Sequence, residues 1–161
     1  MGAVDVYRIT DQLDDATLDV LIARLEARGK HPRFEMMMRE YLDAMAIDSA
    51  RYILDLGCGT GVVARTIARR PPFAGRVMGV DRSPHLVAAA SRLAHDEGIS
   101  ERVAFRTGDS HTLALRDMEF DAVVAHTLFS HLEDPRSVLT EIGGCSNPAA
   151  RWASLMATTH P

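Results

Sequence analysis

The stretch ILDLGCGTG, residues 53–61, places three glycines within five positions, directly after a short apolar run that contains a carboxylate. Glycine allows the backbone to adopt positive φ, and it allows a ligand to approach without a Cβ in the way. Three glycines also cost backbone entropy that a simple turn does not require. We therefore interpret Asp55–Gly61 as a ligand-binding loop between a strand and a helix.

The residues around this loop predict strands that alternate with helices. Apolar runs indicate strands at 52–56, 76–80, 102–107 and 120–125. Helices are expected at 62–70, at 84–97 and from Pro135 onward, and two more are expected earlier, at 14–28 and from Pro32 to Met45. This order predicts an α/β fold, a Rossmann-like doubly wound parallel sheet with N-terminal helices.

Length and composition exclude several classes of protein. A chain of 161 residues is long enough for one domain with a core. Its net charge is −4 and its basic residues are scattered, which argues against a nucleic-acid partner. No apolar run approaches the roughly 18 residues of a membrane helix, so no membrane partner is expected. The N-terminus lacks the pattern of a secretory signal, which makes the cytoplasm the expected location.

The spacing of the loop indicates which nucleotide it binds. Dinucleotide sites use G-x-G-x-x-G, whereas this chain has G-x-G-x-G with Val62 at the position of the last glycine. Asp55 would repel a pyrophosphate but could hold an ammonium group. Asp81, which follows the second strand, could accept hydrogen bonds from two ribose hydroxyls. Asp109, after the third strand, could accept one from an adenine amine.

These segments resemble motifs I to IV of the class I S-adenosylmethionine (SAM)-dependent methyltransferases. The similar segments are Ile53–Gly61, Gly79–Ser83, Thr107–Ser110 and Phe120–Leu128. The resemblance implies SAM as the cofactor and a small-molecule methyl acceptor as the partner. It implies that the glycine loop cradles the methionine part, that Asp81 holds the ribose with Arg82 beside the adenine, and that His126 lies near the sulfonium. The cofactor-binding residues expected in this way are Asp55, Gly57, Cys58, Gly59, Thr60, Gly61, Asp81, Arg82, Asp109, Ser110 and His126.

Two histidines are candidates for a general base. His126 is the first candidate and His131 the second, because both follow the fourth strand. The alternative is that His126 only packs against the cofactor, since orientation alone can carry methyl transfer. We expect no metal, because the two histidines are five residues apart and the chain has no HExxH motif.

The C-terminal residues depart from the family pattern. The resemblance predicts a Lys-Pro-Gly-Gly turn and a fifth apolar strand, whereas the chain reads GGCSNPAARWASLMATTHP after Ile142. No β-branched run appears there, so the sequence predicts that the last strands are lacking. We hypothesise a truncation or a shifted reading frame after Ile142, which sequencing of the gene would test. The expected domains are a helical cap or flank at 1–50, a SAM-binding core at 51–142 and an aberrant tail at 143–161.

A missing fifth strand would expose one edge of the fourth. Such an edge invites pairing with another chain, so we expect marginal stability, self-association, or a tail lying irregularly over the edge. Three functions stay open at this point. They are a SAM-dependent methyltransferase, a non-catalytic remnant that binds SAM or another nucleotide, and an NAD-binding Rossmann protein.

Overall fold

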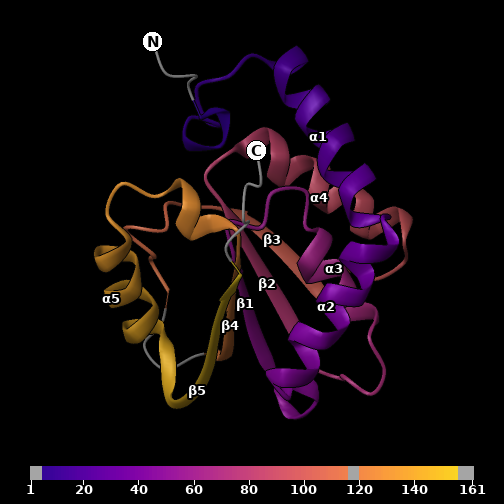
Figure 1. Ribbon diagram of the computed structural model, residues 1–161, viewed down its shortest axis with the longest axis vertical. Helices are drawn as coiled ribbons and strands as arrows, with labels where there is room; N and C mark the ends of the chain where they lie inside the picture. Colours follow the sequence, from indigo (N-terminus) through magenta and orange to yellow (C-terminus); the bar gives the residue numbers. More distant parts are fainter. Residues whose placement is uncertain (1–4, 116–119, 156–161) are drawn as a thin grey trace.

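Five parallel strands form the centre of the protein (Figure 1). In the computed structural model, which describes residues 5–115 and 120–155, the strand order is β3-β2-β1-β4-β5. The strands are β1 Tyr52–Leu56, β2 Arg76–Asp81, β3 Val103–Thr107, β4 Phe120–His126 and β5 Ser146–Leu155. Since β1 is central and the chain winds outward from it on both sides, the predicted doubly wound topology is confirmed.

Helices cover both faces of this sheet. They are α1 Asp15–Gly29, α2 Pro32–Ala44, α3 Val62–Arg69, α4 Pro84–Asp96 and α5 Pro135–Cys145, with short 3-10 turns η1 Val6–Arg8, η2 Ile47–Ser49 and η3 Leu128–His131. The predicted helices are confirmed to within a few residues. Asp14, Ser83 and Asp134 cap three of them by accepting backbone N–H groups of the first turn. No helix in the described ranges is long and apolar enough to cross a membrane.

The core has two layers because neighbouring residues of each strand point to opposite faces. Ile53 of β1 packs with Met38 of α2 and Ile67 of α3 on one face. Leu54 packs with Val138 and Ile142 of α5 on the other. All of these side chains are buried. The sheet is therefore fixed from both sides, and its strand ends can hold a site in rigid geometry.

The predicted absence of a fifth strand is wrong. Residues 146–155 form β5, which lies parallel to β4, with Ala122 opposite Arg151 and Val124 opposite Ala153. The register shifts between Phe120 and Ala122, so a short segment of β5 that contains Pro148 lies outside the regular pairing. A bulge of this kind tolerates a proline, which has no N–H to donate.

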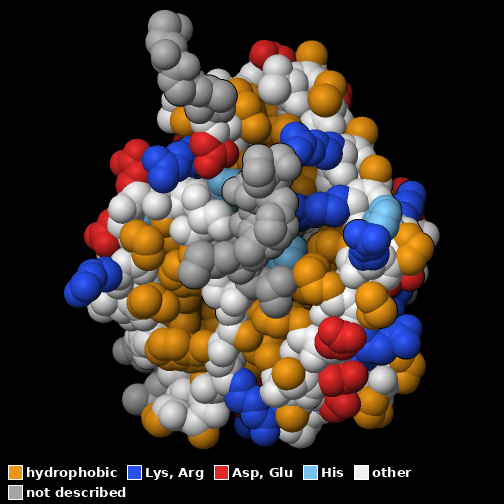
Figure 2. Space-filling model, viewed as in Figure 1, with side chains coloured by type: hydrophobic (Ala, Val, Ile, Leu, Met, Phe, Trp, Pro, Cys, Tyr) orange, Lys and Arg blue, Asp and Glu red, His pale blue; other side chains and the backbone are white. Residues whose placement is uncertain are grey.

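The edge of β4 is covered, so the expected self-association through that edge loses its basis. The tail is a strand and not an irregular covering over this range. Figure 2 shows hydrophobic side chains gathered over α5 and β5, where Leu139 and Trp152 are 45% and 49% exposed. The boundaries proposed at 1–50, 51–142 and 143–161, and the shifted reading frame, stay predictions.

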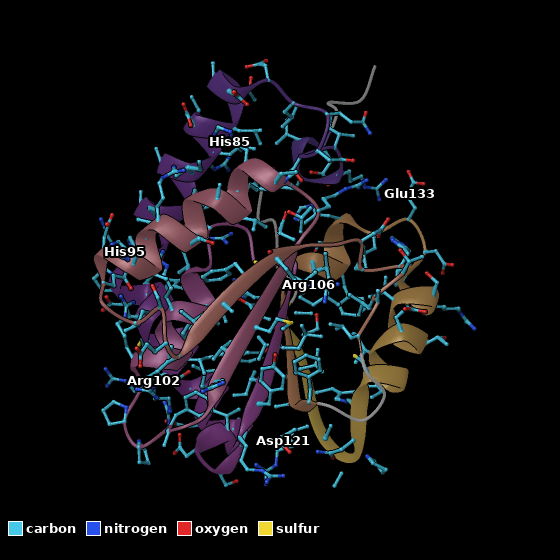
Figure 3. The ribbon with its side chains drawn as sticks, turned by 180° about the vertical axis from the view of Figure 1, so that it is seen from behind. His85, His95, Arg102, Arg106, Asp121 and Glu133 are labelled. Carbon is cyan, nitrogen blue, oxygen red and sulfur yellow. The ribbon has the colours of Figure 1, made fainter. Side chains whose placement is uncertain are left out.

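Asp121 joins three strands at the end of the sheet that carries their amino termini (Figure 3). Its Oδ2 accepts the backbone N–H groups of Arg51 at 2.8 Å and of Tyr52 at 2.9 Å. Its Oδ1 accepts the Nδ2–H of Asn147 at 3.0 Å. One carboxylate therefore ties the beginnings of β1 and β5 to β4.

We predict that Asp121→Ala lowers the free energy of unfolding by about 2–3 kcal/mol, because it leaves backbone donors without their charged acceptor. Asn147→Ala removes only one side-chain hydrogen bond, so about 1 kcal/mol or less is expected. Urea unfolding followed by circular dichroism measures both values. Equal losses in the two variants would show that Asp121 acts through β5 alone.

Candidate functional site

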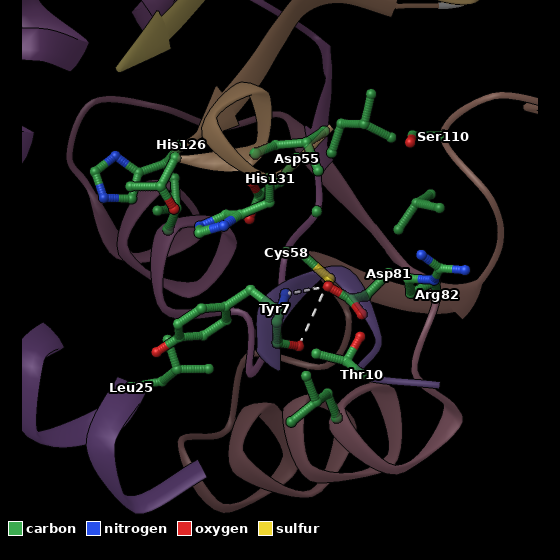
Figure 4. A pocket seen from close by; sticks show the side chains of 18 of the residues that line it. Tyr7, Thr10, Leu25, Asp55, Cys58, Asp81, Arg82, Ser110, His126 and His131 are labelled. Carbon is green, nitrogen blue, oxygen red and sulfur yellow. Dashed lines mark hydrogen bonds between the residues drawn. The ribbon is translucent and has the colours of Figure 1, made fainter. Parts of the chain in front are cut away.

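One cavity of about 470 Å³ opens at the carboxyl ends of the strands. The glycine loop forms one wall, and residues of the N-terminal segment, α1 and η3 form the others (Figure 4). Its volume lies within the range of about 300–1,000 Å³ that is typical of small-molecule sites. Of the residues predicted for the site, Asp55, Gly57, Cys58, Gly59, Thr60, Asp81, Arg82, Asp109, Ser110, His126 and His131 line it. Gly61 is not among the lining residues.

The glycines of the loop have the conformation that the sequence predicts. Gly57, Gly59 and Gly61 have φ of 70°, 54° and 75°, values that favour glycine. A Cβ on Gly57 would stand 2.8 Å from Leu128 Cδ1, and one on Gly61 would collide with Phe105. The glycines thus allow both the tight turn of the loop and the close packing of neighbouring side chains against it.

Four backbone N–H groups of this loop, those of Gly57, Cys58, Gly59 and Gly61, are already used within the protein. Those of Gly57 and Cys58 donate to the Val80 carbonyl at 2.8 and 3.0 Å, and that of Gly61 donates to Cys58 O at 2.8 Å. The N–H of Gly59 donates to Asp81 Oδ2 at 2.8 Å. A pyrophosphate needs free N–H groups in such a loop. The hydrogen bonding therefore disfavours a dinucleotide.

Asp55 lies at the floor of the cavity and is 1% exposed. Its Oδ2 accepts the Ala64 N–H at 3.0 Å, so the carboxylate occupies the N-terminus of α3, where a dinucleotide would place its phosphates. Burial raises the pKa of Asp55 to about 7. The hydrogen bond from Ala64 opposes this shift, and the negative charge of Asp81 adds to it. A cation bound nearby would favour its ionised form.

Asp81 is partly buried and faces the cavity from the end of β2. Its Oδ2 holds Gly59, and its Oδ1 accepts the Ser83 N–H at 3.0 Å. Burial raises its pKa, although these two hydrogen bonds oppose that shift. Since each carboxylate oxygen has two lone pairs, ribose hydroxyls could still bind here.

The residues predicted for the adenine end line the cavity, and two of them are held by other parts of the protein. Arg82 donates to Arg8 O at 2.7 Å and pairs with Asp11 at 3.0 Å, which ties it to the N-terminal segment. Asp109 is exposed, and its Oδ1 accepts the His111 N–H at 2.9 Å, which lowers the pKa of Asp109 although desolvation opposes that shift. Ser110 lines the cavity beside Asp109.

His126 and His131 lie in different environments. His126 is 9% exposed, and burial followed by the charge of Arg28 lowers its pKa to about 4. Its Nδ1 has no hydrogen-bond partner in the described parts of the chain. His126 is therefore a neutral ring at physiological pH, packed edge-on against Phe34 at 5.4 Å between ring centroids.

His131 Nδ1 instead lies 2.6 Å from Asp5 Oδ2, and its ring packs against Tyr7 at 5.0 Å. Burial alone would raise the pKa of Asp5, but the hydrogen bonds from His131 and from the Tyr7 N–H lower it overall. An ionised Asp5 fixes the ring and leaves Nε2 as the nitrogen available for proton transfer. The described residues contain no cluster of three or more His, Cys, Asp or Glu side chains that could hold a metal ion.

Burial raises the pKa of the Cys58 thiol well above its usual range, with the charges of Asp81 and Asp55 adding to the shift. The side chain stays a neutral thiol that packs inside the loop. Because the thiolate is the reactive form, Cys58 is not a nucleophile here.

Sequence reasoning missed the contact between α1 and the glycine loop. Glu26 Oε1 accepts the Thr60 hydroxyl and an Arg65 N–H, each at 2.6 Å, and Arg65 also pairs with Glu97. Arg65 is 3% exposed, so its charge is buried, while Glu26 and Glu97 are partly buried. An arginine within the apolar helix pattern of residues 62–69 was the available signal, because a buried charge requires a partner.

We predict that Asp55→Asn raises the melting temperature at pH 8. The folded-state pKa of about 7 lies above the ordinary 3.8, so the folded state holds an extra proton between these values. Stability from this group is complete below about pH 4 and is lost as the pH rises through about 7. Asparagine stays neutral and can still accept the Ala64 N–H. Thermal unfolding of both proteins from pH 5 to 8 measures the effect, and a variant less stable than the parent at pH 8 would contradict it.

Comparison with known proteins agrees with this geometry. A model of the methyltransferase domain family matches residues 53–149, more than half of the chain. The chain belongs to this family, as the class I motifs predict. An uncharacterized methyltransferase of Mycobacterium tuberculosis is 35% identical over 113 residues, which cover 70% of this chain and 53% of that protein. The chain therefore spans about half the length of this relative.

Two solved structures show related folds. A SAM-dependent methyltransferase from Aquifex aeolicus superposes with a TM-score of 0.73 at 19% identity, over 93% of this chain and 79% of that one. The [4+2]-cyclase SpnF superposes with a TM-score of 0.68 at 28% identity, over 74% of this chain and 44% of that one. The first likeness concerns the fold alone.

Proposed function

We propose that this chain binds SAM and transfers its methyl group to a small-molecule acceptor. The observation that carries the proposal is the pair of carboxylates at Asp55 and Asp81, placed on either side of a loop whose three glycines all donate their N–H groups within the protein. Such a site favours a cation and repels a pyrophosphate. Of the open alternatives, this argues against the NAD-binding protein.

Each part of the cavity has a role in this proposal. The glycine loop accommodates the methionine part, and Asp55 attracts its ammonium group. Asp81 accepts the ribose hydroxyls, while Asp109 and Ser110 meet the adenine edge. SAM supplies a methyl group on a positively charged sulfur. The protein mainly has to orient the acceptor in line with the bond that breaks, which can contribute about 7–11 kcal/mol.

The contacts of the two histidines support His131 over His126 as the general base, which reverses the order expected from the sequence. A pKa of about 4 makes His126 a weak base, and its place beside Phe34 suits a packing role. His131 has a carboxylate on Nδ1, an arrangement that orients the ring. We propose that His131 Nε2 accepts the acceptor's proton where the acceptor is a phenol or an alcohol.

Calorimetric titration tests the binding claim. We predict that the protein binds SAM and S-adenosylhomocysteine but not NAD. We also predict that Asp81→Ala lowers the affinity for S-adenosylhomocysteine at least about tenfold. Asp96→Ala, an exposed change on α4, is the control and should bind as the parent does. Tighter binding of NAD than of S-adenosylhomocysteine would exclude the proposed cofactor. Unchanged affinity in Asp81→Ala would exclude the ribose assignment.

We predict that His131→Gln slows methyl transfer by roughly 10²–10⁴-fold, since this is the usual contribution of a general base. The assay follows labelled methyl from SAM to a panel of phenols and alcohols, across a range of pH. His126→Gln should change the rate of methyl transfer less than His131→Gln does. Neither substitution should lower the affinity for S-adenosylhomocysteine more than a few-fold. An equal rate in His131→Gln and the parent would remove His131 from the mechanism.

Binding without methyl transfer is the second candidate function. The likeness to SpnF, which is described as a cyclase, gives a specific reason to test it. A protein that binds S-adenosylhomocysteine but methylates nothing in the panel would support this second function. The two candidates share the cavity and differ only in the chemistry that follows binding.

A further inference from the structure

Within residues 5–115 and 120–155, four arginines line the cavity, and they divide into two pairs. Arg8 lies 3.8 Å from Asp5 and 3.7 Å from Glu133, and Arg82 pairs with Asp11. These two charges are thus balanced by neighbouring carboxylates of the protein. Arg24 and Arg28 have no such balance, because within the described part of the chain neither guanidinium forms an ion pair or a hydrogen bond.

Arg24 and Arg28 lie four residues apart on α1, so they share one face of the helix. Like charges at this spacing destabilise a helix. Arg28 is exposed, but desolvation of its guanidinium by the neighbouring groups lowers its pKa; Tyr7 opposes that shift and the charge of Arg24 adds to it. The Arg28 guanidinium also stacks over the Phe34 ring, 5.6 Å from its centroid, which fixes its position. An anion bound between the two arginines would relieve their repulsion.

The position of α1 indicates which anion this is. Leu25, which follows Arg24, lies against the glycine loop, with its Cδ1 3.3 Å from where a Cβ of Gly59 would stand. Glu26 binds Thr60 of the same loop. Arg28 also acts electrostatically on His126 at the end of β4. The two arginines therefore stand over the part of the cavity that borders both the loop and the end of β4.

We propose that Arg24 and Arg28 bind the α-carboxylate of the amino-acid end of the adenosyl ligand. This inference rests on the proposed function, which places that end on the glycine loop. The ligand's amino-acid end is a zwitterion, and the cavity offers Asp55 for its ammonium group and two unbalanced guanidinium groups for its carboxylate. Arginine suits this task, since its planar group can form two parallel hydrogen bonds with a carboxylate.

The test compares two ligands that differ only in the carboxylate. S-adenosylhomocysteine carries it, and S-adenosyl-3-thiopropylamine keeps the ammonium group but lacks it. By calorimetry we expect the parent to prefer the first ligand about 10- to 100-fold, as for charge-assisted hydrogen bonds. Arg24→Gln/Arg28→Gln should bind both ligands equally, with affinity for the amine changed less than about twofold. Arg28→Lys should keep part of the preference.

Arg39→Gln is the matched control, because Arg39 is exposed on α2 and does not line the cavity. It should discriminate between the ligands as the parent does. A double variant that keeps the parent's discrimination would overturn the proposal, and so would one that loses affinity for both ligands alike. The latter result would indicate an effect on the helix or on an anionic acceptor. A parent that binds neither ligand would overturn the proposed function itself, and this inference with it.

Discussion

The hydrogen bond from the Gly59 N–H to Asp81 is the contact on which the rest of the site depends. It joins the loop after β1 to the end of β2, and the second oxygen of the same carboxylate holds Ser83 at the start of α4. Glycine is needed at 59 because φ is positive there. One carboxylate thus fixes the loop, the strand end and the next helix, and it is itself kept at the cavity wall.

This arrangement separates negatively and positively charged side chains in the lining of the cavity. Carboxylates at the ends of β1 and β2 lie on one side, and α1 places arginines on another. The network of Glu26, Thr60 and Arg65 keeps α1 against the loop, so this separation of charges does not depend on loose surface contacts. The N-terminal segment closes the cavity further through Asp5 and His131. A ligand with separated positive and negative charges matches these surroundings.

Local sequence was sufficient to predict the sheet as far as β4, the helices and the glycine loop. Short apolar runs, proline at helix starts and glycine at positive φ are signals that neighbouring residues carry. The fifth strand was missed because SNPAARWASL has little intrinsic preference for a strand. Pairing with the free edge of β4 forms it, and tertiary pairing of this kind overrides local preference. Asp5 and Glu26 were missed for the same reason, since their partners His131 and Thr60 are distant in sequence.

The central claim is that this cavity seats an adenosyl amino acid across Asp55 and Asp81. A crystal structure of the protein grown with S-adenosylhomocysteine tests it most directly. The account predicts ligand density between the glycine loop and α1, with both ribose hydroxyls within hydrogen-bond distance of Asp81 and the amino group nearest Asp55. Density for the ligand at any other place on the protein, or a cavity filled only by water at millimolar ligand, would contradict it.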